Sequence, residues 1–247
     1  MKENKKQNIL LTGGTGKLGK KIIESGLFDN IYHPSSCELN ILDFEAIKSF
    51  IELNRIDCVI HCAALARMSL CEKNPIEAIN VNVIGTANIV SSIHLINSSC
   101  KLIYLSSDGV YACKDGNYSE DSPTEPYNIY GHTKLSAESL VKTLKRHLIV
   151  RTRFFDKNVI PFNESAVDIK TSSIEISALI KVLSTLLIKD ILGVINVGEE
   201  SKSDYERYIE FKPTLKKCLR SDIQERLEFN IASDASMNLD KLTEALK

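Results

Sequence analysis

The sequence predicts an α/β protein with a doubly wound parallel sheet and a small, reduced C-terminal lobe. Short apolar runs alternate along the chain with segments of helical periodicity. The apolar runs are continuous, which is typical of strands that are covered on both faces of a parallel sheet. Right-handed crossovers between such strands place helices on both faces, which gives the doubly wound arrangement.

The predicted elements follow one another with short connections. Strands are predicted at 8–12, 30–33, 58–61, 102–106, 148–151 and 194–197, and helices at 16–25, 44–53, 75–96, 127–146 and 177–188. Residues 112–126 contain Gly116, Pro123 and Pro126, which favour a loop. Residues 155–173 and 199–238 are weakly patterned, and we expect them to form the lobe over the strand ends.

A glycine-rich segment, Thr12-Gly13-Gly14-Thr15-Gly16-Lys17-Leu18-Gly19, follows the first predicted strand and opens the first helix. Its glycines permit a tight turn, close approach of a pyrophosphate and close packing of the helix on the sheet. The helix N-terminus adds free N–H groups and a partial positive charge. A turn without a ligand is the alternative, but the strand-turn-helix context favours a Rossmann dinucleotide-binding site. The expected contacts are Gly13, Thr15, Gly16, Lys17 and Leu18.

These features divide the chain into two parts. Residues 1–154 are predicted to form the dinucleotide-binding domain. Residues 155–247 are predicted to supply short substrate-binding segments, together with a returning helix and strand at 174–198 that complete the sheet.

Composition excludes several classes of function. The 31 Lys and Arg residues balance 32 Asp and Glu residues, so neither a nucleic acid nor a membrane surface is expected as the main partner. The apolar run at 9–11 is too short for a signal peptide. Seven cysteines without a Cys-x-x-Cys pair indicate free thiols in a reducing cytoplasm. No cluster of His, Cys or Asp has metal-ligand spacing, so no metal is expected.

Tyr130 and Lys134 are spaced to lie on one face of a helix, one turn apart. A free tyrosine has a pKa of roughly 10, and a nearby ammonium group lowers it. The pair is therefore suited to acid/base chemistry at a carbonyl or alcohol. Tyr208 and Lys212 have the same spacing, but no serine-bearing strand precedes them, so a surface pair is expected there.

With the glycine loop, these motifs make the chain resemble the extended short-chain dehydrogenase/reductase family, nearest to nucleotide-sugar reductases of the dTDP-4-dehydrorhamnose reductase type. The resemblance extends from 9 to 153, and more weakly over 174–198 and 238–242. It implies that Ser107, in the run 105–111, polarises a substrate carbonyl. It also implies that Tyr130 protonates the carbonyl oxygen, and that Lys134 holds the ribose and lowers the pKa of Tyr130. The alternative for Ser107 is a serine-rich loop start.

The same resemblance assigns further contacts. It places Asn40 and Ile41 at the adenine ring, although the family usually has Asp at the first position. Asn82 is placed beneath the site, in either a structural or a catalytic role. The strand end running under the cofactor contributes Ala63, Ala64 and Leu65, and the expected substrate contacts are Ser107, Asp108, Arg153 and Phe154.

The cofactor is predicted to be NADP or NAD. The segment His33-Pro34-Ser35-Ser36 follows the second strand and carries neither the acid typical of NAD enzymes nor an arginine, which slightly favours NADPH. Asp156-Lys157 replaces the Tyr-Gly of the family, and only 156–173 remain for the usual long substrate segment.

Three functions remain open. The leading one is an NAD(P)H-dependent reductase of a nucleotide-linked 4-keto sugar. The second is a nucleotide-sugar epimerase or dehydrogenase that retains NAD. The third is a non-catalytic regulatory subunit of the same fold, which the shortened lobe allows. The family resemblance also suggests a homodimer through the helices at 75–96 and 127–146.

Overall fold

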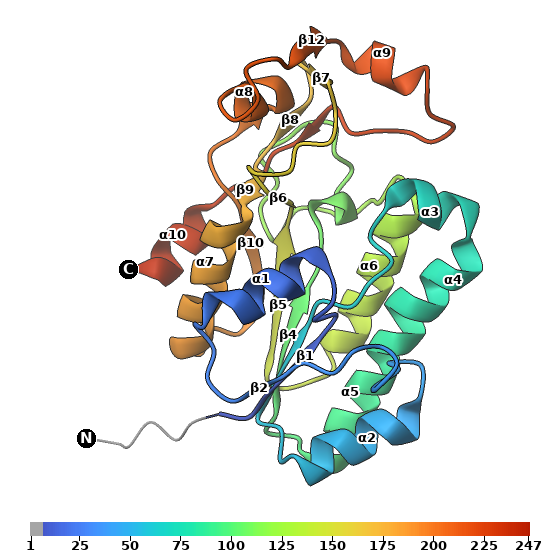
Figure 1. Ribbon diagram of the computed structural model, residues 1–247, viewed down its shortest axis with the longest axis vertical. Helices are drawn as coiled ribbons and strands as arrows, with labels where there is room; N and C mark the ends of the chain where they lie inside the picture. Colours follow the sequence, from blue (N-terminus) through green and yellow to red (C-terminus); the bar gives the residue numbers. More distant parts are fainter. Residues whose placement is uncertain (1–6) are drawn as a thin grey trace.

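A computed structural model describes residues 7–247, and a six-stranded sheet lies at its centre. Its strand order is β10-β5-β4-β3-β1-β2, and every neighbouring pair is parallel (Figure 1). The strands are β1 (Ile9–Thr12), β2 (Ile31–Tyr32), β3 (Cys58–His61), β4 (Lys101–Leu105), β5 (His147–Thr152) and β10 (Gly193–Val197). This confirms the predicted doubly wound parallel sheet.

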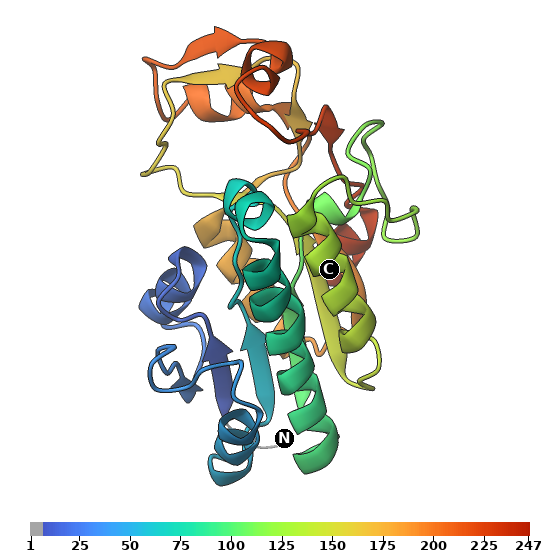
Figure 2. The same cartoon turned by 90° about the vertical axis from the view of Figure 1, so that its right-hand side faces the viewer.

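Helices cover both faces of the sheet (Figures 1 and 2). One face carries α1 (Lys17–Ser25), α7 (Ile176–Ile188) and α10 (Asp240–Leu246), and the other carries α2 (Phe44–Leu53), α5 (Gly85–Ile96) and α6 (Ile129–Val141). Alternate strand residues divide between the two cores: Ile9 and Leu11 pack with the α1 side, and Leu10 packs with the α2 side. This follows from the two-residue side-chain period of a strand.

The predicted helix at 75–96 contains a change in winding. It consists of α4 (Pro75–Ile79), a π-helical turn η1 (Asn80–Ile84) and α5, and a short unpredicted helix, α3 (Met68–Lys73), precedes it. By length and composition alone this stretch could cross a membrane. In the structure α5 packs against α2 and α6, and Ile89, Val90 and Ile93 are buried there, so packing within the protein accounts for the apolar residues on this side of the helix.

The helix predicted at 127–146 is shorter at both ends. It begins after Asn128, whose side chain caps it by accepting a hydrogen bond from the Gly131 amide at 2.7 Å, and it ends at Val141. Residues 112–126 form the predicted loop, which a β-bridge between Tyr118 and Met237 anchors.

A lobe of short elements lies beyond the carboxyl ends of the strands (Figure 1). A two-stranded junction of β6 (Phe154–Phe155) and β9 (Ile174–Glu175) leads into it. The lobe contains β7 (Glu164–Ala166), β8 (Lys170–Thr171), β11 (Lys202–Ser203), α8 (Asp204–Ile209), β12 (Lys216–Cys218), α9 (Arg220–Gln224) and β13 (Asp234–Ala235). Parallel-sheet proteins bind ligands at this edge of the sheet, so the site is sought between sheet and lobe.

Candidate active site

The turn between β1 and α1 approaches the end of β3 closely. Gly13 has a φ of +77°, and a Cβ there would lie 2.6 Å from the Ala63 amide nitrogen. Only glycine fits both constraints. The Gly16 amide donates to the Gly13 carbonyl at 3.0 Å, and α1 then begins at Lys17 with its first-turn N–H groups directed outward from the helix end. The local geometry is that of a phosphate-binding turn.

A pocket of about 300 Å³ lies against this turn. The predicted cofactor residues that line it are Gly13, Thr15, Gly16, Asn40, Ile41, Ala63 and Ala64. The side chain of Leu18 is in the core, so Leu18 can contact a cofactor only through its backbone N–H. Lys17 is exposed and can do so through its backbone N–H or with its side chain from the rim of the pocket. The side-chain oxygen of Asn40 already accepts a hydrogen bond from the Leu42 amide at 3.0 Å.

Asn82 holds the segment after β3 in place. Its side-chain oxygen accepts from the Leu65 amide at 2.7 Å, and its amide donates to the Leu65 carbonyl and to the Thr133 hydroxyl at 3.1 and 2.9 Å. The residue is 1% exposed and lies in the π-helical turn, a winding often found at functional sites. Its hydrogen bonds join Leu65 to the helix that carries Tyr130. This is a structural role, one of the two roles for Asn82 that the sequence left open.

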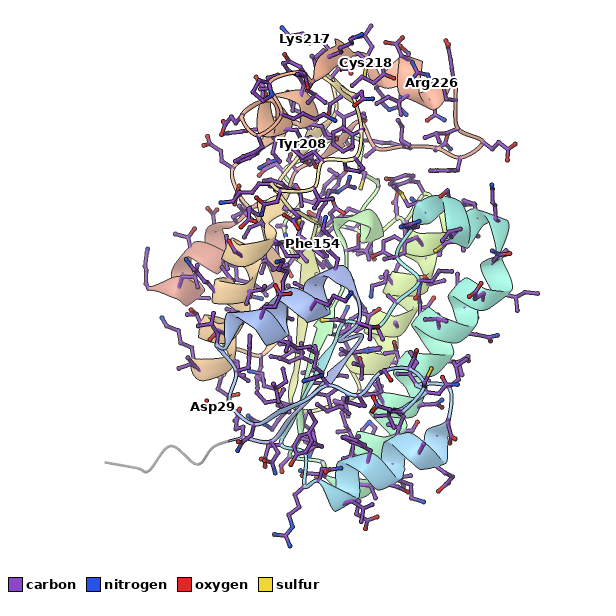
Figure 3. All side chains as sticks on the ribbon, in the orientation of Figure 1. Asp29, Phe154, Tyr208, Lys217, Cys218 and Arg226 are labelled. Atoms are coloured by element: carbon purple, nitrogen blue, oxygen red, sulfur yellow. The ribbon has the colours of Figure 1, made fainter. Side chains whose placement is uncertain are left out.

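A second pocket, of about 270 Å³, opens at the ends of β4 and β5. It brings together all the predicted substrate residues and the predicted proton donor Tyr130: Ser107, Asp108, Tyr130, Arg153 and Phe154. Phe154 lies where the sheet meets the lobe (Figure 3). Parallel strands end at one edge of a sheet, which explains why residues so distant in sequence share a pocket.

Ser107 belongs to a small hydrogen-bonded group. Its hydroxyl donates to one oxygen of Asp108 at 3.1 Å and accepts from the Gly109 amide at 3.0 Å. The other Asp108 oxygen accepts from Nε of Arg153 at 2.6 Å. This carboxylate holds the pKa of Arg153 well above its usual range, despite burial of the guanidinium. Arg153 thus fixes Asp108, and Asp108 fixes the hydroxyl of Ser107.

Tyr130 reaches the same pocket because α6 packs unusually close to the turn after Ser107. A Cβ at Gly131 would overlap the carbonyl oxygen of Gly109, so a larger residue there would push the helix away. Burial, followed by the charge of Asp108, raises the pKa of Tyr130 to about 12, and a hydrogen bond with Ser107 opposes this rise. The phenol is therefore protonated at neutral pH.

Lys134 lies one turn further along α6 and is 2% exposed. Its Nζ lies 4.1 Å from the centroid of the Tyr104 ring. Burial lowers the pKa of Lys134 to about 7. The structure thus differs from the expectation of a lowered pKa for Tyr130: burial and the charge of Asp108 raise it, and the groups that oppose the rise are Ser107 and Arg153.

A buried ion pair that the sequence analysis missed supports these residues from behind. Glu138 accepts from Nη2 and Nε of Arg151 at 2.7 and 3.0 Å, and from the Ser106 hydroxyl at 2.6 Å. Both charged residues are at most 2% exposed. Tyr130, Lys134 and Glu138 follow one another at four-residue steps, so the sequence could have indicated Glu138 on the same helix face, but not its partner Arg151.

His61 is a structural residue. It closes β3, where its ring nitrogens lie 2.6 Å from the Thr12 hydroxyl and 3.0 Å from the Thr86 hydroxyl. Burial lowers the pKa of His61 to about 3, so the ring is neutral. Within residues 7–247 no group of three or more His, Cys, Asp or Glu side chains could hold a metal ion.

Residues 7–162 match the family model described as RmlD substrate binding domain. The chain belongs to the RmlD substrate binding domain family. The glycine turn and the Tyr130 pocket both lie within the matched residues, as the resemblance to nucleotide-sugar reductases implied.

Curated relatives of this RmlD-family chain carry two kinds of name. Methionine adenosyltransferase 2 subunit beta of Xenopus tropicalis is 31% identical over 182 residues, which cover 69% of this chain and 54% of that protein. dTDP-4-dehydrorhamnose reductase of Mycolicibacterium smegmatis is 31% identical over 151 residues, which cover 59% of this chain and 45% of that protein. The chain thus spans about half the length of the curated relatives it matches.

Solved structures confirm the fold. A dTDP-4-dehydrorhamnose reductase of Bacillus anthracis, in complex with NADP, superposes with a TM-score of 0.87 at 23% identity and covers 97% of this chain and 93% of that one. A match over 97% of the chain includes most of the lobe as well as the sheet.

Proposed function

We propose that this protein is an NAD(P)H-dependent reductase of the keto group of a nucleotide-linked sugar, with a 4-keto deoxysugar as the leading candidate. The observation that carries the proposal is the pocket in which Ser107 and Tyr130 meet, together with the separate pocket at the glycine turn. The reductase of Mycolicibacterium smegmatis, at 31% identity, supports the same reading.

The residues around the first pocket fit a nicotinamide dinucleotide. The Gly13 turn leaves no room for a Cβ, the first-turn N–H groups of α1 suit a pyrophosphate, and Ile41 lies in the pocket wall where it can pack on adenine. Pro34 and Ser36 line the pocket where an acid would mark an NAD enzyme, and Glu38 is turned to the Ser35 amide and hydroxyl at 2.7 and 2.8 Å. This arrangement slightly favours NADPH.

The chain's own residues supply the proton chemistry. When bound, the reduced nicotinamide supplies the hydride. Tyr130, kept protonated by its raised pKa, donates a proton to the substrate oxygen. Ser107 polarises the same oxygen once its hydroxyl turns from Asp108, and Lys134 binds the ribose from below the pocket.

The substrate side of the pocket is polar at one end and aromatic at the other. Arg153 keeps 28% of its side chain exposed while Asp108 holds its Nε, so its remaining N–H groups can donate to sugar or phosphate oxygens. Phe154 offers a flat surface for the sugar. Substrate contacts of this kind, under the proposal, bring the reacting carbonyl to Ser107 and Tyr130, which line the same pocket.

The direct test is oxidation of NADPH by purified protein in the presence of a panel of nucleotide-linked 4-keto sugars. We expect turnover with at least one member and tighter binding of NADPH than of NADH in a fluorescence titration. Folded protein that binds NADPH but oxidises it with no member of the panel would contradict the proposal. Stoichiometric NAD retained through purification would instead favour an epimerase or dehydrogenase.

A second candidate is a non-catalytic subunit of a larger enzyme, which the 31% identity to methionine adenosyltransferase 2 subunit beta favours. Under this proposal the chain binds a methionine adenosyltransferase, and Tyr130→Phe leaves that binding unchanged. Co-elution of the two proteins on size exclusion, with wild type and Tyr130→Phe side by side, tests it. The Tyr130, Ser107 and Lys134 set weighs against it, because binding alone requires none of their proton chemistry.

A further inference from the structure

Lys134 is 2% exposed, and its ammonium lacks an ordinary protein partner although Nζ is not among the fully enclosed polar atoms. Among residues 7–247, its Nζ makes no hydrogen bond and no ion pair with any side chain or carbonyl within contact distance. The nearest carboxylate on its helix, Glu138, is already taken by Ser106 and by two nitrogens of Arg151. A buried ammonium left in this way is costly unless another group stabilises its charge.

The face of the Tyr104 ring is in a position to do so. The ring centroid lies 4.1 Å from Nζ of Lys134, well inside the range in which a cation is attracted to an aromatic face. Tyr104 lies in β4, is 1% exposed and pairs in register with His61 of β3 and Ile149 of β5. The position of the ring is thus fixed by the centre of the sheet.

The hydroxyl of Tyr104 adds an independent observation. It is buried and makes no hydrogen bond of normal geometry among the residues that the structure describes; the Thr86 hydroxyl lies near enough to oppose the rise of the Tyr104 pKa, but it donates its proton to the Asn82 carbonyl. An unpaired buried hydroxyl destabilises a fold, so it does not explain a tyrosine at this position. The ring itself is the part of the side chain that makes a specific contact.

We propose that Tyr104 is a positioning residue whose ring face holds the ammonium of Lys134 beneath the site and stabilises its charged form. The inference rests on the proposed function for the role it gives Lys134 toward the ribose, but the contact itself does not. The His61 ring lies against the Tyr104 ring, with 5.7 Å between centroids, and His61 is held by Thr12 at the start of the glycine turn. The turn and the lysine are thereby connected through packed side chains.

The proposal requires that the other groups near Lys134 do not fix its charge by themselves. The titratable groups around it are Tyr130 and Glu138 of α6, His61 and Cys62 at the end of β3, and Tyr104 of β4. His61 is neutral, burial keeps Cys62 and Tyr130 protonated at neutral pH, and Glu138 is paired with Arg151. Glu138 still favours the ammonium from a distance, but burial outweighs this attraction, and the ring face is the group in direct contact with Nζ.

A matched set of variants isolates the ring from the hydroxyl. Tyr104→Phe keeps the ring and removes the unpaired hydroxyl, while Tyr104→Leu and Tyr104→Met keep apolar volume and remove the ring. The readout is the pKa of Lys134, followed by NMR of isotope-labelled lysine side chains and assigned with Lys134→Arg. We expect Tyr104→Leu and Tyr104→Met to lower it by about one unit, a tenfold change in proton affinity, and Tyr104→Phe to leave it near the wild-type value.

The wild-type spectrum provides a readout that needs no variant. Lys134 methylene protons held over the Tyr104 ring are shifted upfield by its ring current, so unshifted signals would overturn the proposal even if the Leu and Met variants fail to fold. Equal pKa values of Lys134 in the ring-bearing and ringless variants would overturn it as well. Neither measurement needs turnover, so the contact can be tested even if the protein shows no reductase activity. Reductase activity in a protein whose Lys134 pKa is the same in all variants would support the proposed function and contradict this inference.

Discussion

The spacing Tyr-x-x-x-Lys occurs twice in this chain, and the two copies lie in different surroundings. Tyr130 and Lys134 belong to the same 13-residue helix, α6, which packs against the sheet. Lys134 is buried over the Tyr104 ring, and Tyr130 lines the pocket that contains Ser107. Both side chains are therefore directed at the ends of the central strands.

Tyr208 and Lys212 belong to the lobe and are not on one helix. α8 ends at Ile209, so Lys212 lies beyond the helix that carries Tyr208. The Tyr208 ring packs edge-on against Phe155 and Phe162, with centroids 5.4 and 5.0 Å away, in the lobe position seen in Figure 3. Nζ of Lys212 donates to the Ile160 and Phe162 carbonyls and to the Asn163 side chain.

The ammonium groups of the two lysines thus make different contacts. Lys212 satisfies oxygen acceptors and fixes a loop, whereas Lys134 keeps its N–H groups free of protein acceptors at the edge of a predicted binding site. A lysine that retains unused donors while buried carries a cost in stability, and such costs gather at functional sites. The two Tyr-x-x-x-Lys copies have the same spacing, and the contacts of their lysines distinguish them.

The largest expected difference between the copies is in turnover. Tyr130→Phe removes the proton donor and should lower kcat by about 10²–10⁴-fold, the usual contribution of general acid catalysis. Tyr208→Phe keeps the ring that packs on Phe155 and should change kcat by less than about threefold. Steady-state oxidation of NADPH with the best nucleotide sugar measures both. Equal effects in the two variants would remove the distinction between the copies.

The sequence predicted the parts of this site that depend on local pattern. The strand at 58–61 and the turn at Gly13 are each determined by a few neighbouring residues, so apolar runs and glycines are enough to find them. Tyr130 came from its spacing to Lys134 and Ser107 from the family resemblance, and their shared pocket follows from the common edge of parallel strands.

The parts that depend on tertiary contacts were not predictable in the same way. The pair of Glu138 with Arg151 forms across two elements, and the cation site on Tyr104 needs the packing of α6 on β4. The strands of the lobe are two or three residues long, too short to show a period. The sequence predicted a lowered pKa for Tyr130, whereas burial raises it, because the spacing of a motif does not show how deeply a side chain is buried.

A second difference should appear in the stability of the lobe. Lys212→Met leaves the Ile160 and Phe162 carbonyls without their donor, which should cost about 1 kcal/mol because these partly exposed groups can turn to water. Lys134→Met removes a buried charge that no carboxylate contacts, so it should leave the lobe unchanged. Hydrogen exchange of residues 156–163 distinguishes them. Faster exchange in Lys134→Met than in Lys212→Met would contradict the assignment of Lys212 as the lysine that stabilises this loop.

A third difference is expected in how stability depends on pH. The native pKa of Lys134 is about 7, against 10.5 for a lysine in the unfolded chain. Below about pH 7 both states hold the proton, and the native state bears the full cost of the buried ammonium. Between these values the native state releases the proton while the unfolded state keeps it, so the contribution of Lys134 to the free energy of unfolding rises with pH.

Lys134→Met removes this contribution. The slope of unfolding free energy against pH should therefore be smaller in Lys134→Met than in wild type, by at most about 1.4 kcal/mol per pH unit. Urea denaturation at several values between about pH 7 and about pH 9 measures the slopes, and the other titrating groups cancel in the difference. Lys212→Met is the control for loss of a partly exposed lysine. Parallel curves for wild type and Lys134→Met would mean that Lys134 keeps an ordinary pKa, and the physical contrast between the two Tyr-x-x-x-Lys copies would then rest on Tyr130 alone.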